Sequence, residues 1–226
     1  MRFQDKVVVV TGAGQGLGAG FAKDFAAEGA KVVLVGRTAA KVEKVADEIN
    51  AAGGKALPLG CDVGKPEEVG RCFHSIFERF GRVDILINNA AYHKSLSVVD
   101  TSVEEWSKQI NTNLNGTFYC TKAVLPGMIE RRYGKIVNMS SAGAKLFFPG
   151  FGAYAASKGG IVSLTQILSE EVKDYNINVN AVYLGMTNTE HTRERFDSDK
   201  AVTIALEDML QVDEVSKVVL FLASDD

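Results

Sequence analysis

The architecture of this chain follows from one segment, Lys6-Val-Val-Val-Val-Thr-Gly-Ala-Gly-Gln-Gly-Leu-Gly18. The valine run predicts a buried strand, and Phe21, Phe25 and Ala26 then recur at helical spacing. A glycine loop between a strand and a helix lets the backbone approach a pyrophosphate, which the first amides of the helix can bind. Glycines alone could reflect turn chemistry, but the flanking elements favour a dinucleotide site. The expected contacts in this loop are Gly12, Gln15, Gly16, Leu17 and Gly18.

The same pattern of strand and helix continues along the chain. Further strands are expected at 31–35, 55–60, 84–87, 135–139 and 177–182, and helices from Thr38 and at 66–80, 102–131 (in one or two pieces), 154–172 and 212–223. Strands that alternate with helices predict an α/β fold, a Rossmann-type doubly wound parallel sheet with helices on both faces. We expect one domain over residues 1–226, with ligands at the carboxyl ends of the strands.

Composition excludes several functional classes. The 226 residues are 46% hydrophobic and 23% charged, as in ordinary globular proteins, and the net charge of −3 offers no attraction for nucleic acid. No apolar run is long enough to span a membrane and no signal peptide is evident, so we expect a cytoplasmic protein. Three cysteines without a CxxC motif, and three scattered histidines, predict neither a disulfide framework nor a metal site.

Gly36-Arg37-Thr38 follows the second strand and bears on the choice of dinucleotide. Folds selective for NAD place an acid here to accept hydrogen bonds from the ribose 2′-hydroxyl, whereas an arginine accommodates the 2′-phosphate of NADP. No acid occurs before Glu43, so we predict that NADP(H) is favoured over NAD(H), with Arg37 on the phosphate. The alternative, a solvated charge at a strand end, stays open because Gln15 is neutral where a second basic group could help.

Tyr154-Ala-Ala-Ser-Lys158 is the candidate for acid/base chemistry. On a helix its tyrosine and lysine share one face, and a nearby ammonium lowers the pKa of a phenol from about 10. Tyr154 could then exchange a proton with a substrate oxygen. Ser141 ends the strand upstream, and Asn113 sits in a helical pattern as either a structural linker or a site residue. A Tyr and Lys pair alone is far more often a solvated surface pair.

Together these motifs resemble the short-chain dehydrogenase/reductase family, in particular its 3-oxoacyl-ACP reductase-like members. The resemblance spans the chain and includes Thr11-Gly-x-x-x-Gly16-x-Gly18, Asp62-Val63, Asn88-Asn-Ala-Ala91 and Tyr154-x-x-x-Lys158. It implies that Tyr154 is the general acid or base, that Ser141 polarises the substrate oxygen, and that Lys158 holds the nicotinamide ribose. It also implies that Asn113 positions a water in a proton relay. The further cofactor contacts that it implies are Asp62, Val63, Asn89, Ala90, Tyr154, Lys158, Gly185 and Thr189.

The resemblance also bears on the carboxyl end and on assembly. Phe221-Leu-Ala-Ser-Asp-Asp226 resembles the closing helix of the family, and the family's seventh strand is missing after it, so we expect six strands. Relatives associate through the helices that match 102–131 and 154–172. We therefore expect a homodimer or homotetramer.

The substrate is left open by the sequence. Residues 185–210 should cover it, and the candidate pocket residues His93, Phe148 and Phe151 could equally serve in packing or in a subunit contact. The resemblance implies a small-molecule ketone or secondary alcohol. The leading hypothesis is an NADP(H)-dependent oxidoreductase, and the alternative is a dinucleotide-binding sensor or regulatory protein of the same fold without turnover. An epimerase or lyase is a third possibility.

Overall fold

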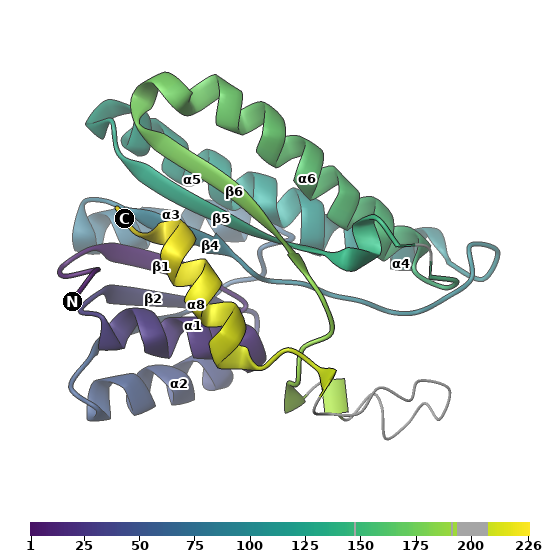
Figure 1. Ribbon diagram of the computed structural model, residues 1–226, viewed down its shortest axis with the longest axis horizontal. Coiled ribbons are helices and arrows are strands. Elements are labelled where there is room, and N and C mark those ends of the chain that lie inside the picture. Colours follow the sequence, from purple (N-terminus) through teal and green to yellow (C-terminus); the bar gives the residue numbers. More distant parts are fainter. Residues whose placement is uncertain (147, 191, 194–207) are drawn as a thin grey trace.

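The computed structural model describes residues 1–146, 148–190, 192–193 and 208–226 of the chain. The strands in this part of the chain are β1 Val7–Thr11, β2 Lys31–Gly36, β3 Lys55–Gly60, β4 Ile85–Asn88, β5 Gly134–Ser141 and β6 Ile177–Leu184. All are parallel and form one sheet in the order β3-β2-β1-β4-β5-β6 (Figure 1). The predicted doubly wound sheet is confirmed.

Helices cover both faces of this sheet (Figure 1). They are α1 Gly16–Ala27, α2 Ala39–Ala51, α3 Pro66–Phe80, α4 Val103–Ile110, α5 Gly116–Arg131, α6 Gly152–Val172 and α8 Val212–Ala223. The predicted helix over 102–131 consists of two pieces, α4 and α5, joined by a π-helical turn at Asn111–Asn115. Thr38 immediately precedes α2, where the helix was expected to start, and its side chain accepts no hydrogen bond from the helix.

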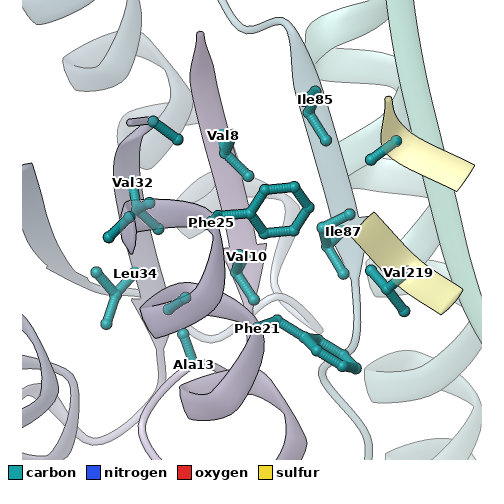
Figure 2. Packing of buried hydrophobic residues seen from close by; sticks show 14 of the residues in the cluster. Val8, Val10, Ala13, Phe21, Phe25, Val32, Leu34, Ile85, Ile87 and Val219 are labelled. Atoms are coloured by element: carbon teal, nitrogen blue, oxygen red, sulfur yellow. The ribbon is translucent and has the colours of Figure 1, made fainter. Parts of the chain in front are cut away.

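The core is divided between the two faces by the alternation of side chains along each strand. Val8 and Val10 of β1 pack with residues of α1, α2 and α8, whereas Val7 and Val9 pack with residues of α3, α5 and α6. Figure 2 shows the first cluster, in which Phe25 lies against β1 and its neighbouring strands. A valine run suits β1 because both of its faces are buried.

Several strand boundaries differ from the prediction by one or two residues. β5 runs on to Ser141, because Ser140 and Ser141 pair with Tyr183 and Leu184 of β6, and backbone pairing places no demand on side-chain polarity. β4 begins one residue later than expected, at Ile85. The consequence for the site is that Ser141 is held at the end of an ordered strand.

The sheet order reverses direction between β1 and β4, the central pair. In open α/β sheets such a switch point leaves a crevice at the carboxyl ends of the strands, where ligands bind. The glycine loop leaves β1 here, and Asn89 and Ala90 leave β4 beside it. No helix among the described residues is long and apolar enough to cross a membrane.

Candidate active site

A cavity of about 390 Å³ lies at this switch point. Its described lining residues are Gly12, Gly14, Gln15, Gly16, Leu17, Gly18, Gly36, Arg37, Thr38, Lys41, Val42, Cys61, Asp62, Val63, Asn89, Ala90, Ala91, Thr112 and Thr189. They include every predicted cofactor contact except Tyr154, Lys158 and Gly185. The lining residues that were not predicted as cofactor contacts include Lys41 and Thr112. For Lys41 the available signal was its place four residues after Arg37 at the start of a helix.

The glycine loop leaves no room for side chains. Gly12 has φ +66°, and a Cβ there would lie 2.9 Å from the Ala90 Cα atom. A Cβ at Gly18 would lie 2.3 Å from the Gly12 carbonyl oxygen. Both contacts are far below van der Waals separation, so only glycine permits this path. The result is a bare backbone at the start of α1, which fits a pyrophosphate group.

Thr11 and Asn89 tie this loop to the end of β4. The Thr11 hydroxyl accepts hydrogen bonds from the backbone N–H groups of Asn89 and Ala90, both at 3.0 Å. The Asn89 amide donates to the carbonyl oxygens of Thr11 and Gly12 at 2.9 and 3.3 Å. Asn89 therefore holds the floor of the cavity together, and its expected contact with the cofactor stays a prediction.

A second loop, after β3, closes another side of the cavity. The Asp62 carboxylate accepts a hydrogen bond from the Gly64 N–H at 3.0 Å, and Glu68 accepts one from the Asp62 N–H at 2.8 Å. Val63 packs against Gly116, where a Cβ would lie 2.8 Å from the valine side chain. These contacts place Asp62 and Val63, two of the expected cofactor contacts, on the cavity wall.

Lys158 is a buried cation beside the site. It lies on α6 with only 3% of its surface exposed, and its Nζ donates to the Met139 carbonyl oxygen of β5 at 2.6 Å. Burial lowers the Lys158 pKa to about 8, so at neutral pH most of the ammonium groups keep their charge. The Nζ atom lies 5.6 Å from the centroid of the Tyr154 ring. The predicted pairing of cation and phenol is therefore present.

Ser141 lies at the end of β5, close to the turn of α6 that carries Tyr154. Its Oγ accepts a hydrogen bond from the Gly143 N–H at 3.1 Å, which leaves the hydroxyl hydrogen able to donate. The neighbouring Ser140 hydroxyl donates to the Lys158 carbonyl oxygen at 3.0 Å and so fixes the end of β5 against α6. This link sets Ser141 and the Tyr154 turn of α6 side by side.

Asn113 is fully buried in the π-helical turn, and most of the hydrogen-bonding groups of its side-chain amide have partners. Its Oδ1 accepts from the Tyr92 N–H at 2.7 Å, and its Nδ2 donates to the Tyr92 carbonyl and to the Ser157 Oγ, both at 3.0 Å. The Ser157 hydroxyl in turn donates to the Tyr154 carbonyl at 2.7 Å. Asn113 is thus a structural link to the Tyr154 turn, and its role in a water relay stays a prediction.

The candidate pocket residues gather around Tyr154. The His93 ring centroid lies 4.6 Å from that of Tyr154 and 4.4 Å from that of Phe151, and Phe148 lies 5.4 Å from Phe151. The Leu96 N–H donates to the Gly150 carbonyl at 3.0 Å and joins the two loops that carry these rings. Their contact with a substrate stays a prediction.

The segment expected to cover the substrate is described in part. Thr189 lies against the glycine loop, 3.5 Å from where a Cβ of Gly16 would be, and it lines the cavity. Gly185 does not line it; its carbonyl accepts from the Thr187 hydroxyl at 3.4 Å. Phe147, His191 and residues 194–207 lie outside the described residues. Among those described, no three His, Cys, Asp or Glu side chains gather as a metal site would require.

Comparison with known proteins identifies the family. The model of the family described as short chain dehydrogenase matches residues 6–200. The chain belongs to the short-chain dehydrogenase family. Proteins of this family are oxidoreductases that bind a nicotinamide dinucleotide, so the cavity is that of an enzyme.

Individual relatives agree over almost the whole chain. Meso-2,3-butanediol dehydrogenase of Serratia marcescens is 35% identical, with 100% of this chain and 90% of the relative covered. The 3-oxoacyl-[acyl-carrier-protein] reductase FabG of Pseudomonas aeruginosa is 36% identical, with 100% and 92% covered. A crystal structure of a 3-oxoacyl-[acyl-carrier protein] reductase with bound NAD from Brucella melitensis matches with a TM-score of 0.88 at 31% identity, covering 99% of this chain and 86% of that one.

Proposed function

We propose that this short-chain dehydrogenase interconverts a ketone and a secondary alcohol with NADP(H), using Tyr154 as general acid and base. The observation that carries the proposal is the buried Lys158, whose Nζ lies 5.6 Å from the Tyr154 ring while Ser141 ends the adjacent strand. Burying the Lys158 ammonium costs solvation free energy. The fold does not need a charged side chain at this position. A positive charge beside a phenol favours its phenolate form.

The roles of the chain's own groups follow from chemistry. A bound nicotinamide dinucleotide supplies the hydride for reduction or accepts it in oxidation. Tyr154 donates its proton to the substrate oxygen as negative charge develops there, and the Ser141 hydroxyl donates a second hydrogen bond to the same oxygen. Lys158 stabilises the phenolate that is left, and its two remaining N–H hydrogens can hold the ribose. Arg37, which lines the cavity, binds the 2′-phosphate.

The decisive experiment is the Tyr154→Phe variant, assayed with NADPH and a panel of ketones that includes 3-oxoacyl thioesters, diketones and small cyclic ketones. Loss of the proton donor should lower kcat by at least about a hundredfold. NADPH affinity, measured by fluorescence titration, should stay within about twofold, because the phenol oxygen adds little to cofactor binding. Full turnover in this variant would remove Tyr154 from the mechanism.

The relatives support the choice of substrate panel. Their names describe reductases of 3-oxoacyl groups on acyl-carrier protein and a dehydrogenase of a diol, all of which interconvert a carbonyl and a secondary alcohol. The runner-up, a dinucleotide sensor without turnover, has no need of Ser141, Tyr154 and a buried Lys158. Wild-type protein that binds NADPH but reduces no member of the panel would favour the sensor.

We also propose that the chain forms a homodimer or homotetramer in the cytoplasm. Exposed apolar side chains on three helices support this, namely Trp106 on α4, Phe118 on α5 and Ile167 on α6. Exposed aromatic and aliphatic groups on adjacent helices are typical of subunit contacts. Sedimentation velocity that shows only monomer would contradict the proposal.

A further inference from the structure

Lys41 lines the cavity but has no assigned role. It lies in the first turn of α2, and its ammonium donates a hydrogen bond to the Oε1 atom of Gln15 in the glycine loop. A Cβ at Gly14 would lie 2.9 Å from the Lys41 Cβ, so the loop backbone packs directly on the stem of this side chain. Lys41 therefore connects the start of α2 to the loop at one end of the cavity.

The same end of the cavity holds Arg37. The end of β2 lies close to α2: a Cβ at Gly36 would lie 2.7 Å from the Val42 Cγ1 atom. Arg37, Thr38 and Lys41 thus line one small region. Asp62 is the only acid among the described lining residues, and its Oδ1 already accepts a bond from Gly64. Two cations and a hydroxyl therefore face this end without a carboxylate between them.

The present partner of Lys41 leaves its charge uncompensated. Gln15 offers a neutral amide oxygen, so the ammonium keeps its full charge and two further N–H hydrogens. A phosphate monoester carries close to two negative charges at neutral pH and forms stronger, charge-assisted hydrogen bonds than an amide does. Exchange of Gln15 for such a group is favourable, and the flexible lysine stem permits it.

We propose that Lys41 binds the 2′-phosphate of NADP(H) together with Arg37, giving up its bond to Gln15 when it does so. The inference rests on the proposed NADP(H) function. It explains how a second positive charge reaches the phosphate although Gln15 in the glycine loop is neutral. That charge comes from Lys41 on α2. Lys41 is then a specificity residue, and Gln15 is its partner in the ligand-free protein.

The test uses Lys41→Met in the full chain and two matched ligand pairs. NADPH and NADH differ only by the 2′-phosphate, as do 2′,5′-ADP and 5′-AMP, and the second pair needs no turnover. Lys41→Met should weaken NADPH and 2′,5′-ADP by about tenfold and leave NADH and 5′-AMP within about twofold. Lys41→Arg should retain most of the phosphate preference.

The matched control is Lys44→Met, which removes the same charge from the exposed surface of α2 at a residue that does not line the cavity. Its affinities should stay within about twofold of wild type for all four ligands. Equal weakening of both members of each pair by Lys41→Met would overturn the inference, because it would mean that Lys41 only holds the loop through Gln15. A wild-type preference for NADPH that survives Lys41→Met would also overturn it while leaving the proposed function intact. A wild type that does not prefer NADPH would overturn the NADP(H) assignment itself.

Discussion

Lys158 shows how one side chain links the stability of this protein to its chemistry. Its ammonium is buried against the Met139 carbonyl, and burial lowers its pKa to about 8. The hydrogen bond to a carbonyl and the nearby Tyr154 ring offset only part of the lost hydration, since neither carries a negative charge. The site thus holds a cation at a cost in solvation, and in the proposed mechanism this cation would stabilise a Tyr154 phenolate more strongly than a solvated lysine could.

This burial predicts a dependence of stability on pH. The Lys158 pKa is about 8 in the folded protein, against 10.5 for an ordinary solvated lysine, so between these values the unfolded chain binds more protons and folding stability rises with pH. Compared with Lys158→Met, wild-type protein without cofactor should gain about 2 kcal/mol of unfolding free energy from pH 7.5 to 9.5. Urea titrations at several pH values measure this difference.

The control for the pH series is Lys122→Met, which removes an exposed lysine from α5. Its stability should follow that of the wild type across the whole range, because this side chain is exposed to solvent in the folded protein as it is in the unfolded chain. Parallel curves for wild type and Lys158→Met would show that Lys158 is hydrated and would refute the burial argument.

At the scale of single elements, two helical glycines, Gly18 and Gly70, differ in the room that a side chain would find. Gly18, in the first turn of α1, lies where a Cβ would be 2.3 Å from the Gly12 carbonyl oxygen and 2.6 Å from the Asn89 side chain. Gly70 lies in the middle of α3, where a Cβ would meet no atom within 4 Å. The first glycine serves the close approach of loop and helix, and the second serves no contact.

The same substitution at the two sites should therefore change stability in opposite directions. Gly70→Ala should raise the free energy of unfolding by about 0.5–1 kcal/mol, because alanine loses less backbone entropy in a helix. Gly18→Ala should lower it by about 1–3 kcal/mol, because the added methyl group overpacks the loop, and should also weaken NADPH binding. Thermal unfolding and cofactor titration of both variants measure the contrast, and a Gly18→Ala protein with wild-type affinity would contradict the close-packed loop.

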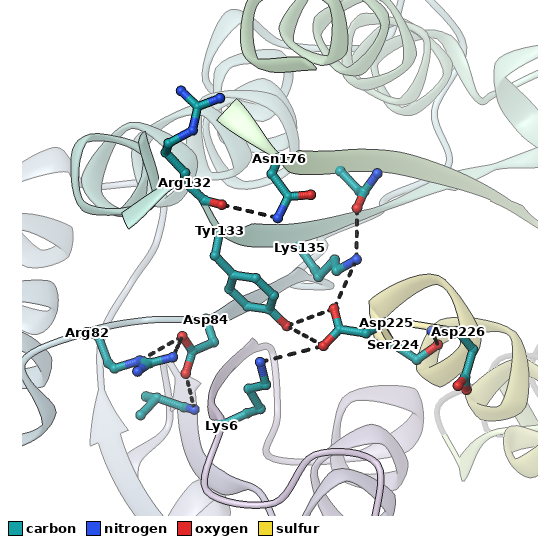
Figure 3. A network of polar contacts seen from close by, with 12 residues as sticks. Lys6, Arg82, Asp84, Arg132, Tyr133, Lys135, Asn176, Ser224, Asp225 and Asp226 are labelled. Carbon is teal, nitrogen blue, oxygen red and sulfur yellow. Dashed lines mark hydrogen bonds and ion pairs between the residues drawn. The ribbon is translucent and has the colours of Figure 1, made fainter. Parts of the chain in front are cut away.

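At the scale of the whole molecule, α8 joins the two ends of the chain. It begins beside α1, where a Cβ at Gly20 would lie 2.4 Å from the Val212 Cγ1 atom, and Val219 is buried in the core. Its last turn leads to Asp225, whose carboxylate lies 3.6 Å from the Lys6 ammonium and 3.3 Å from that of Lys135 (Figure 3). One carboxylate therefore binds cations from the starts of β1 and β5.

The network around Asp225 predicts a modest, salt-sensitive contribution to stability. Partial burial raises the pKa of this carboxyl, but the hydrogen bond to Lys135 and the charges of Lys6 and Lys135 outweigh it, so the pKa is lowered overall. Its contribution is therefore present above the ordinary pKa of an aspartate and is lost as pH falls through the lowered value. At pH 7, Asp225→Asn should lower the free energy of unfolding by about 0.5–1 kcal/mol. The loss should be smaller at about 0.5 M salt, because salt screens the ion pairs of Asp225 with Lys6 and Lys135.

Asp226→Asn is the control for Asp225, because it removes the same charge one residue later and the described structure gives that carboxylate no ion pair. Its unfolding free energy should match that of the wild type within about 0.3 kcal/mol. Equal effects of the two substitutions would show that net charge matters here, and not the contact of α8 with Lys6 and Lys135.

The sequence by itself determined the architecture and most of the residues in the cavity. The valine run, the glycine loop and the helical spacing of apolar residues are local patterns, and backbone geometry converts them into a strand, a turn and a helix. Because parallel strands bring their carboxyl ends to one edge, residues as distant as Gly12, Arg37, Asp62 and Asn89 could be assigned to one site before their contacts were known.

Tertiary structure alone decided which side chains meet. The hydrogen bonds from Lys41 to Gln15, from Lys158 to Met139 and from Asn113 to Ser157 join residues that are 19 to 44 positions apart in the sequence. No local period encodes these pairs, since they arise from the order of strands and the angle at which helices pack on them. Likewise the π-helical turn that buries Asn113 follows from its partners on α6 and in the loop after β4, and propensity within Asn111–Asn115 does not predict it.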